Sequence, residues 1–314
     1  MRRSNLLILA AALVAATIFA PGILAQDEDN TVSVVVMTPW LAQPGTQLMV
    51  DAFEEYATRK GWDVNIIDTA GDVDELASRM EDIVEEDVDA IVINVDPTQI
   101  STGLQAAADA GIPVFGMDAG SDPLLVTNVT SNSYTMAAET ATYVVDRLNG
   151  EGNVVMFIFE PYPPVQKRGV IAEAIFNNTP DITILEEVTP SFENGPLEGA
   201  RVAMEEILQE NPEPGSISAV WAAWDDPALG ALQAIEAAGR EDEGIVIVGI
   251  DAIPQARSAI ARDSNFEATI AQNFPGIART VVDLVDDYLD GEDIIWRTYY
   301  VATTLITRIN ALDE

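Results

Sequence analysis

The sequence contains no cysteine and no histidine, and only two of its 314 residues are lysine. Without cysteine, the chain can form no disulfide and carry no lipid-modified cysteine. Without cysteine and histidine it lacks the usual zinc ligands, and Cys–His pairs and Ser–His–Asp triads are excluded. No glycine pattern of the phosphate-loop or dinucleotide-binding type follows a strand-like run. We therefore expect neither a metal nor a cofactor.

Positive charge is also scarce, because 15 basic residues stand against 52 acidic ones and give a formal net charge of −37. Such a surface repels the phosphates of nucleic acids and anionic lipids, so we expect no nucleic-acid partner. A cationic ligand is one interpretation of the acidity. A heavily solvated surface, as in proteins of saline habitats, is the interpretation we favour, because most acids fall in helical stretches such as residues 72–87.

The first 25 residues have the layout of a secretory signal peptide. Arg2 and Arg3 precede an apolar run, residues 6–20, and Pro21 breaks the run before the small residue Ala25. We expect cleavage near Ala25 and a periplasmic mature protein. A permanent anchor helix is the alternative, but the run is short for a span of about 20 residues.

From residue 32 onward, short apolar runs alternate with stretches of helical spacing. The runs are four to seven residues long, as buried strands of parallel sheets are. A polar, β-branched stretch at residues 126–133 separates two such series of similar length, and we interpret it as a crossing between domains. About 290 mature residues also fit two domains better than one. The predicted fold class is α/β, with two doubly wound parallel-sheet domains that face a central cleft.

Several of these runs end on a polar side chain, and ligands of open α/β sheets bind at the carboxyl ends of the strands. An ionised aspartate accepts hydrogen bonds, whereas an amide both donates and accepts them. Each of these residues alone could instead cap the following helix. Together they favour a ligand pocket. The residues are Asn94, Asp118, Asp225, Asp251 and Gln272.

Arg168 is predicted to begin a helix over residues 168–177, where the helix dipole disfavours a cation. We therefore expect it in the cleft, where it would donate to ligand oxygens and balance the aspartates. A surface ion pair with Glu173 is the alternative.

Aromatic residues also fall near loops and strand ends. Trp40, Trp224 and Phe192 are candidates to contact the C–H face of a sugar or polyol, whereas Trp221 is expected in the core. A pair of carboxylates can hydrolyse glycosides, so an enzyme remains an alternative. The architecture alone leaves exported binding proteins, two-domain enzymes and sensory domains open.

Several segments together carry a family resemblance: AIVINVDP, GIPVFGMDA, AVWAAWDDPALGALQAIEAAG, IVIVGIDAIP and EATIAQNFPGIA. The chain resembles the ribose- and galactose-type periplasmic substrate-binding proteins of ABC transporters over nearly all of its mature length. The resemblance implies that residues at the matching positions line a sugar site. These residues are Asn94, Asp118, Arg168, Phe192, Asp251 and Gln272, with Asp225 matching a further acid of the motif.

Three departures from the family pattern bear on specificity. Ala119 stands where sugar binders usually have arginine, and Trp224 replaces an asparagine of the pocket. In the N-terminal loop, Gln43, Gly45 and Thr46 stand where an asparagine and paired aromatics are usual, with Trp40 nearby. We expect a neutral polyhydroxy ligand other than ribose, either a different sugar or a polyol.

The resemblance also implies two domains that close on the ligand and then dock on a membrane permease. The expected domains are residues 26–131 with 273–302, and residues 132–272 with 303–314. We expect a monomer that serves import and is not an enzyme. A sensory protein that presents ligand to a membrane receptor would use the same fold.

Overall fold

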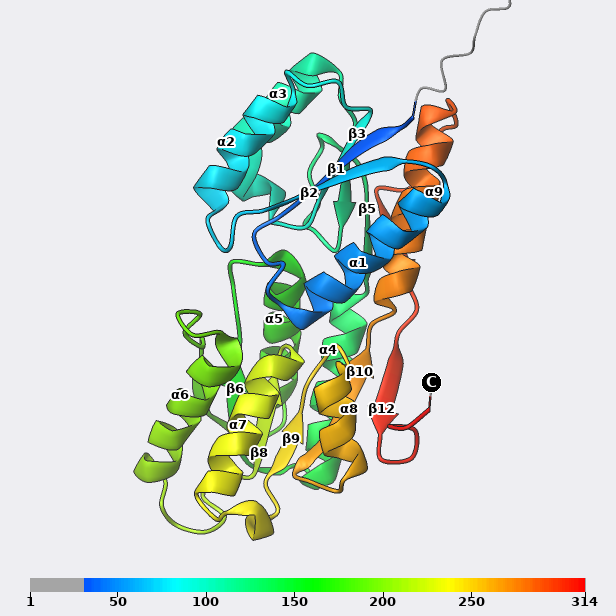
Figure 1. Ribbon diagram of the computed structural model, residues 1–314. Coiled ribbons are helices and arrows are strands. Elements are labelled where there is room, and N and C mark those ends of the chain that lie inside the picture. The colour runs from blue at the N-terminus through cyan, green and yellow to red at the C-terminus, as the bar shows by residue number, and fades with distance from the viewer. Residues whose placement is uncertain (1–30, 314) are drawn as a thin grey trace, which may run out of the picture. The chain divides into compact units, whose positions relative to one another are not determined.

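The computed structural model describes residues 31–313, and the expected signal peptide lies outside them. Within this range no helix has both the length and the apolar character that a membrane span requires. The described chain forms two sheets, each covered by helices on both faces (Figure 1). The α/β fold expected from the alternating pattern is therefore confirmed.

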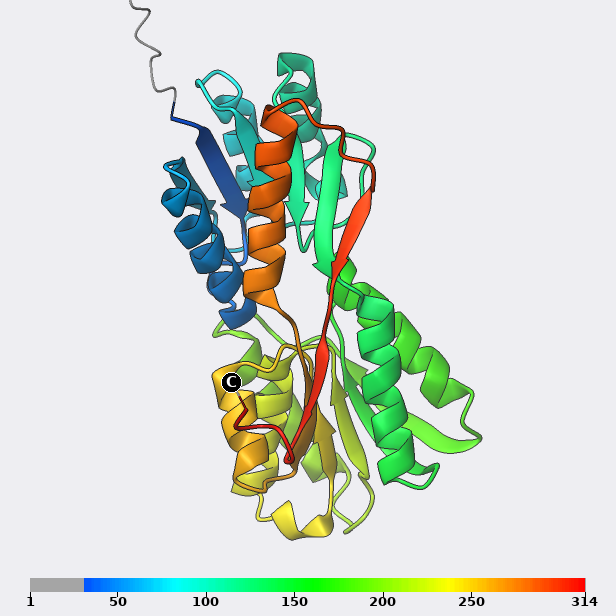
Figure 2. The ribbon, with the colours of Figure 1, turned by 90° about the vertical axis from the view of Figure 1, so that its right-hand side faces the viewer.

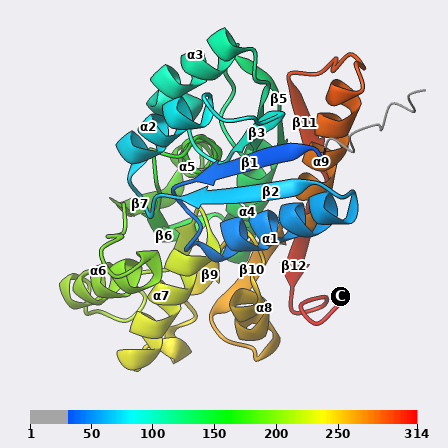
Figure 3. The ribbon, with the colours of Figure 1, turned by 45° about the horizontal axis from the view of Figure 1, so that its top comes forward.

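The first sheet has six parallel strands in the order β11-β5-β4-β3-β1-β2. Its strands are β1 (Ser33–Thr38), β2 (Asp63–Asp68), β3 (Ala90–Ile93), β4 (Val114–Met117), β5 (Leu125–Ser131) and β11 (Thr298–Val301). One face packs against α1 (Pro44–Arg59) and α9 (Phe274–Leu289). The other face packs against α2 (Val73–Ile83) and α3 (Ser101–Ala110), and the short helix η1 (Pro97–Ile100) precedes α3 (Figure 3). Both faces are buried, which explains why these strands read as continuous apolar runs.

The second sheet has the order β12-β10-β9-β8-β6-β7, and only its edge strand β12 runs antiparallel to its neighbour. Its strands are β6 (Glu151–Phe157), β7 (Asp181–Val188), β8 (Ala219–Ala222), β9 (Val246–Val248), β10 (Phe266–Ala271) and β12 (Thr304–Thr307). One face packs against α4 (Ser133–Arg147) and α5 (Pro163–Asn177). The opposite face packs against α6 (Pro196–Glu210), α7 (Asp225–Ala237) and α8 (Pro254–Ala261), and the short helix η2 (Glu241–Glu243) follows α7.

The chain passes between the two sheets three times. It does so after β5, after β10 and between β11 and β12, and the three segments run close to one another in Figure 2. These crossings lie near Ser131, Asn273 and Ala302, where the boundaries of the expected domains fall. The division of the chain into two separate domains at these points stays a prediction.

Two local features differ from the sequence-based expectation. Residues 125–131 form a buried strand of the first sheet, β5, and the crossing begins only after it. The helix expected from Arg168 begins five residues earlier, at Pro163, because proline fits the first helical turn, whose N–H groups need no intrahelical partner. Arg168 therefore lies in the second turn of α5, and the argument from the helix dipole does not apply to it.

Candidate ligand-binding site

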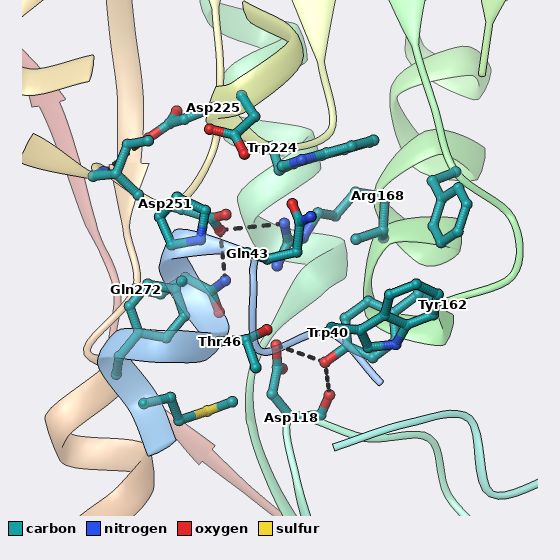
Figure 4. Close-up of a pocket in the computed structure, with 18 of the residues that line it drawn as sticks. Trp40, Gln43, Thr46, Asp118, Tyr162, Arg168, Trp224, Asp225, Asp251 and Gln272 are labelled. Atoms are coloured by element: carbon teal, nitrogen blue, oxygen red, sulfur yellow. Dashed lines mark hydrogen bonds and ion pairs between the residues drawn. The ribbon is translucent and has the colours of Figure 1, made fainter. Parts of the chain in front are cut away.

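A cavity lies between the carboxyl ends of the two sheets, and its walls come from both (Figure 4). The first half contributes the start of α1 and the residue after β4, and the second contributes α5 and the segments after β6, β8 and β9. The residues that line the cavity are Trp40, Gln43, Pro44, Gly45, Thr46, Met49, Asp118, Phe159, Tyr162, Val165, Arg168, Phe192, Trp224, Asp225, Asp226, Asp251, Ile253, Gln272 and Phe274. Nine of the ten residues expected from the sequence are among them, and Asn94 is not.

Asp118 follows β4 with a left-handed backbone, at φ 54°. Its carboxylate accepts hydrogen bonds from the hydroxyls of Thr130 and, at 3.4 Å, Tyr162. Behind it, the Asn128 side chain accepts a hydrogen bond from the Ala119 N–H at 3.1 Å and donates one to the Ala119 carbonyl at 2.9 Å. These two hydrogen bonds fix the turn. Burial raises the pKa of Asp118, and the Arg168 guanidinium partly offsets this. The carboxylate is thus presented to the cavity by a turn that is held from behind.

Asp251, Arg168 and Gln272 form one hydrogen-bonded group at the other end of the cavity (Figure 4). Asp251 Oδ1 accepts from Gln272 Nε2 at 2.8 Å and lies 3.4 Å from Arg168 Nη1. Arg168 is only 2% exposed, and its Nη1 also donates to the backbone carbonyl of Ala223 at 2.8 Å. Burial raises the pKa of Asp251 to about 6, against the opposing effect of Arg168. Asp251 has φ 127°, in a region that few residues other than glycine adopt, so its backbone is strained at this position.

Asp225 and Asp226 open helix α7, but they differ in their surroundings. Asp225 is fully buried and accepts from Thr269 Oγ1 at 2.7 Å and from the Ile253 N–H at 2.9 Å. Burial and the neighbouring Asp251 carboxylate raise the pKa of Asp225 well above its usual range. Its oxygens thus tie three segments of the second half together. Asp225 does not cap α7, which has no side-chain cap, so neither the capping alternative nor ligand contact alone describes its role.

Asn94 lies behind the cavity and does not line it. Its Nδ2 donates to the Met117 carbonyl and to the Tyr162 hydroxyl, both at 2.8 Å, and its Oδ1 accepts from Thr38 Oγ1 at 3.1 Å. The side chain is fully buried. It therefore positions Tyr162 and the end of β4, and its amide is already occupied by protein groups.

Four aromatic rings form one continuous wall of the cavity. Phe159 and Phe192 are in contact, with centroids 4.8 Å apart, and Trp224 stacks on Phe192 at 6.2 Å with an interplanar angle of 24°. Trp40 closes the wall from the first half, 5.9 Å from Phe159 in an edge-on arrangement. Trp221 instead lies in the core with Nε1 bonded to Thr140, as expected.

Buried polar atoms without a hydrogen-bond partner gather at this cavity. Among the described residues five such side-chain atoms occur, and four belong to lining residues: Trp40 Nε1, Gln43 Oε1, Arg168 Nε and Gln272 Oε1. Buried polar groups are almost always paired, so these two donors and two acceptors are free to bond a polar ligand in the cavity. Within residues 31–313 no group of three or more acidic side chains is placed to hold a metal ion.

Sequence reasoning missed three lining residues with distinctive roles, namely Phe159, Tyr162 and Asp226. Phe159 and Tyr162 lie in the loop between β6 and α5, and no local pattern marks that loop as a wall of the cavity. Asp226 follows Asp225 directly, and two adjacent acids at the start of a helix are typical of a helix N-terminus, so the pattern did not mark Asp226 as a ligand residue.

The molecule has two α/β halves, which are joined by three crossing segments and enclose a polar cavity at their strand ends. This arrangement defines a class of protein that holds a small molecule between its halves. The chain belongs to the periplasmic binding protein family, because the model of the periplasmic binding protein domain matches residues 34–293. Its fold is the type I fold of that family.

Relatives of known function and known structure agree with this assignment. The chain is 30% identical over 246 residues to the ribose import binding protein of Bacillus subtilis (strain 168), covering 77% of this chain and 76% of that protein. It is 30% identical over 237 residues to the xylitol-binding protein of Mycolicibacterium smegmatis, covering 73% and 64%. The structure of an ABC transporter solute binding protein from Agrobacterium vitis with bound allitol is similar at a TM-score of 0.82 and 27% identity, covering 90% of this chain and 97% of that one.

Proposed function

We propose that this protein is an exported solute-binding protein that captures a small polyhydroxy ligand, a sugar or a polyol, and delivers it to an ABC import permease. The observation that carries the proposal is the set of unpaired buried donors and acceptors at one cavity. A hydroxyl group both donates and accepts, so a ligand with several hydroxyls can satisfy all of them at once. The named relatives that bind ribose, xylitol and allitol support the same ligand class.

The cavity offers complementary groups to such a ligand. Asp118 and Asp251 accept from ligand hydroxyls, and Arg168 and Trp40 donate to them. The aromatic wall covers the C–H face of the carbon skeleton, where apolar contact is favourable. Gln43 and Gln272 each leave an amide oxygen free to accept. We infer that all of these residues, together with Phe192 and Trp224, contact the ligand, whereas Asn94 and Asp225 act by holding their neighbours.

Closure of the two halves is part of the proposal. A ligand that contacts Gln43 and Asp118 on one wall and Arg168 and Asp251 on the other favours the arrangement in which the walls face each other. The domains would be residues 26–131 with 273–302, and 132–272 with 303–314, with the crossing segments as hinges. The closed form would be the one that docks on the permease.

Export, the monomeric state and the lack of catalysis complete the proposal. The N-terminal pattern supports a signal peptide that is removed near Ala25 and a periplasmic location. Size-exclusion chromatography with light scattering tests the monomer. Mass spectrometry of a bound glycoside over time tests catalysis, because any product that accumulates would contradict a role in binding alone.

Ligand binding is tested by thermal-shift screening of the mature protein against sugars, polyols, nucleosides and amines, followed by calorimetry of each compound that raises the melting temperature. We expect only compounds with several hydroxyls to bind. Gln272→Ala should weaken binding about tenfold or more, because it removes a buried hydrogen-bonding group. Gln209→Ala, an exposed change on α6, is the matched control. A protein stabilised only by compounds without hydroxyl groups would overturn the proposal.

A further inference from the structure

Four carboxylates line the cavity, and they differ in their hydrogen-bond partners. Asp118, Asp225 and Asp251 each accept hydrogen bonds from neighbouring side chains. Among the described residues the Asp226 side chain makes no hydrogen bond and no ion pair, although it is only 8% exposed and lines the cavity. Its oxygens are not among the fully buried unpaired atoms, so they face the open space of the cavity. A ligand that covers them removes their water, which is costly unless the ligand supplies a group that binds the carboxylate.

The charge balance of the cavity shows what kind of group is missing. Four carboxylates line the cavity, but the only cationic side chain among the lining residues is Arg168. That guanidinium lies against Asp251. The adjacent Lys167 lies over the ring of Tyr134, outside this cavity. Its charge lowers the pKa of Asp118, but no cation among the described residues acts on the pKa of Asp226. Asp226 also sits in the first turn of α7, where the helix dipole favours the ionised form. A ligand that closes over Asp226 without bringing positive charge would leave either an unbalanced buried anion or a carboxyl group that has to take up a proton.

The packing of the aromatic wall limits which kind of cationic group a ligand can place beside Asp226. Neighbouring rings of the wall have centroids 4.8–6.2 Å apart, so they pack on one another and leave no gap for a trimethylammonium group between them. An ammonium that keeps N–H bonds can instead donate to the carboxylate of Asp226. Trp224, two residues before it, lines the same cavity and can offer its ring face to the same cation.

We propose that the ligand carries one primary or secondary ammonium group in addition to its hydroxyls, and that Asp226 binds that group. The inference rests on the proposed function and narrows its ligand class to amino sugars and amino polyols. The neutral ligand expected from the sequence followed from the departures from the family pattern at Ala119, Trp224 and the N-terminal loop, and Asp226 played no part in that expectation. Burial raises the pKa of Asp226 to about 6, so its carboxylate is ionised at pH 7.5 and can pair with an ammonium group.

Matched ligand pairs test the inference. Calorimetry at pH 7.5 would compare D-glucose with D-glucosamine, D-galactose with D-galactosamine, and each hydroxyl compound that binds in the screen with its monoamino derivative. We expect the amino member of the best pair to bind at least about tenfold more tightly. Asp226→Asn should reduce this ratio to about one, and so should lowering the pH of the wild-type protein to 5. Asp242→Asn, an exposed change in η2 of the same half, is the matched control and should leave the ratio unchanged.

The possible results separate the two proposals. If neutral members bind as tightly as their amino derivatives or more tightly, the amine inference is wrong and the proposed function stands. If the preference for the amine persists in Asp226→Asn, the assignment to Asp226 is wrong. If no hydroxyl compound binds, with or without an amino group, the proposed function fails and the inference fails with it. Thermal melting of both variants confirms that each is folded.

Discussion

The hydroxyl of Tyr162 donates a hydrogen bond to the backbone carbonyl of Asp118 and accepts one of 2.8 Å from the Asn94 amide. Tyr162 belongs to the half of the molecule that contains α5, whereas Asp118 and Asn94 belong to the other half. A single phenol therefore joins the two walls of the cavity beside a carboxylate that faces it. The nearby hydrogen bond from Gln99 Nε2 to the Pro161 carbonyl, at 3.0 Å, reinforces the same contact.

Tyr162→Phe should weaken ligand binding without unfolding the protein. The ring stays, but the contact across the cavity loses its hydrogen bonds, so the arrangement that holds ligand becomes less populated. A net hydrogen bond contributes about 1 kcal/mol, so we expect an affinity loss of about fivefold by calorimetry. Tyr288→Phe is the matched control, because among the described residues the Tyr288 hydroxyl makes no hydrogen bond. If the two variants bind ligand with equal affinity, the Tyr162 hydroxyl does not stabilise the ligand-binding arrangement.

Arg168→Met should destabilise the protein as well as abolish binding. The change leaves the buried Asp251 carboxylate with Gln272 as its only side-chain partner, and breaking a buried ion pair in this way costs about 3–5 kcal/mol. Urea unfolding at pH 7.5 measures the loss.

The double variant Arg168→Met/Asp251→Asn separates stability from binding. It should recover much of the stability, because no unpaired charge remains, but it should not recover ligand affinity. If the double variant is as unstable as Arg168→Met, the packing of Arg168 and its bond to the Ala223 carbonyl matter more than its charge.

Much of the fold could be predicted because its signals are local. Continuous apolar runs such as residues 90–93 are buried on both faces of a parallel sheet, and the helix α3 that follows this run ends at a clear stop, Gly111. The rule that ligands bind at strand carboxyl ends then predicts from the sequence alone that Asp118 and Asp251 face a ligand pocket, and both line the cavity.

What could not be predicted depends on contacts between distant segments. The strand-end rule gives the position of Asn94 but not the direction of its side chain, which is fixed by Met117 on the neighbouring strand and by Tyr162 from the other half. The positive φ of Asp251 has no local signature either, because a glycine would normally mark such a position. The difference between Asp225 and Asp226 arises from the segments that pack over α7, which a single sequence does not reveal.

Trp224→Asn introduces the residue that the family resemblance implies for this position and should change ligand preference. Trp224 is stacked on Phe192 and only 8% exposed, so its removal opens the aromatic wall and adds an amide donor and acceptor. We expect the affinity for the native ligand to fall about tenfold or more, as losses of large aromatic contacts do. Thermal-shift profiles over the same compound panel should also change in rank order. Trp296→Ala, at a position 65% exposed and away from the cavity, should leave the profile unchanged.

Asp226→Asn should stabilise the ligand-free protein at pH 7.5 and have little effect at pH 4. Burial raises the pKa of Asp226 from 3.8 to about 6, so the folded state binds its proton more tightly than the unfolded chain does. Stability linked to this group is therefore present at low pH and is lost as the pH rises through 6. The loss is about 3 kcal/mol at neutral pH, and the asparagine variant avoids it. Unfolding free energies of both proteins between pH 4 and 8 give the difference, and a difference that does not depend on pH would show that charge burial is not its cause.

Added salt should stabilise the protein through general screening of its charge. A formal charge of −37 with only 15 basic residues makes the folded chain repel itself, and ions shorten the range of that repulsion. We expect the melting temperature to rise by several degrees between about 0.05 and 1 M NaCl, since about 1 kcal/mol corresponds to about 2–4 °C for a chain of this size. Sodium, potassium and choline chlorides at equal ionic strength should act alike if screening is the cause. A rise with one cation only would instead point to a specific cation site, and the carboxylates of the cavity would be the first place to look for it.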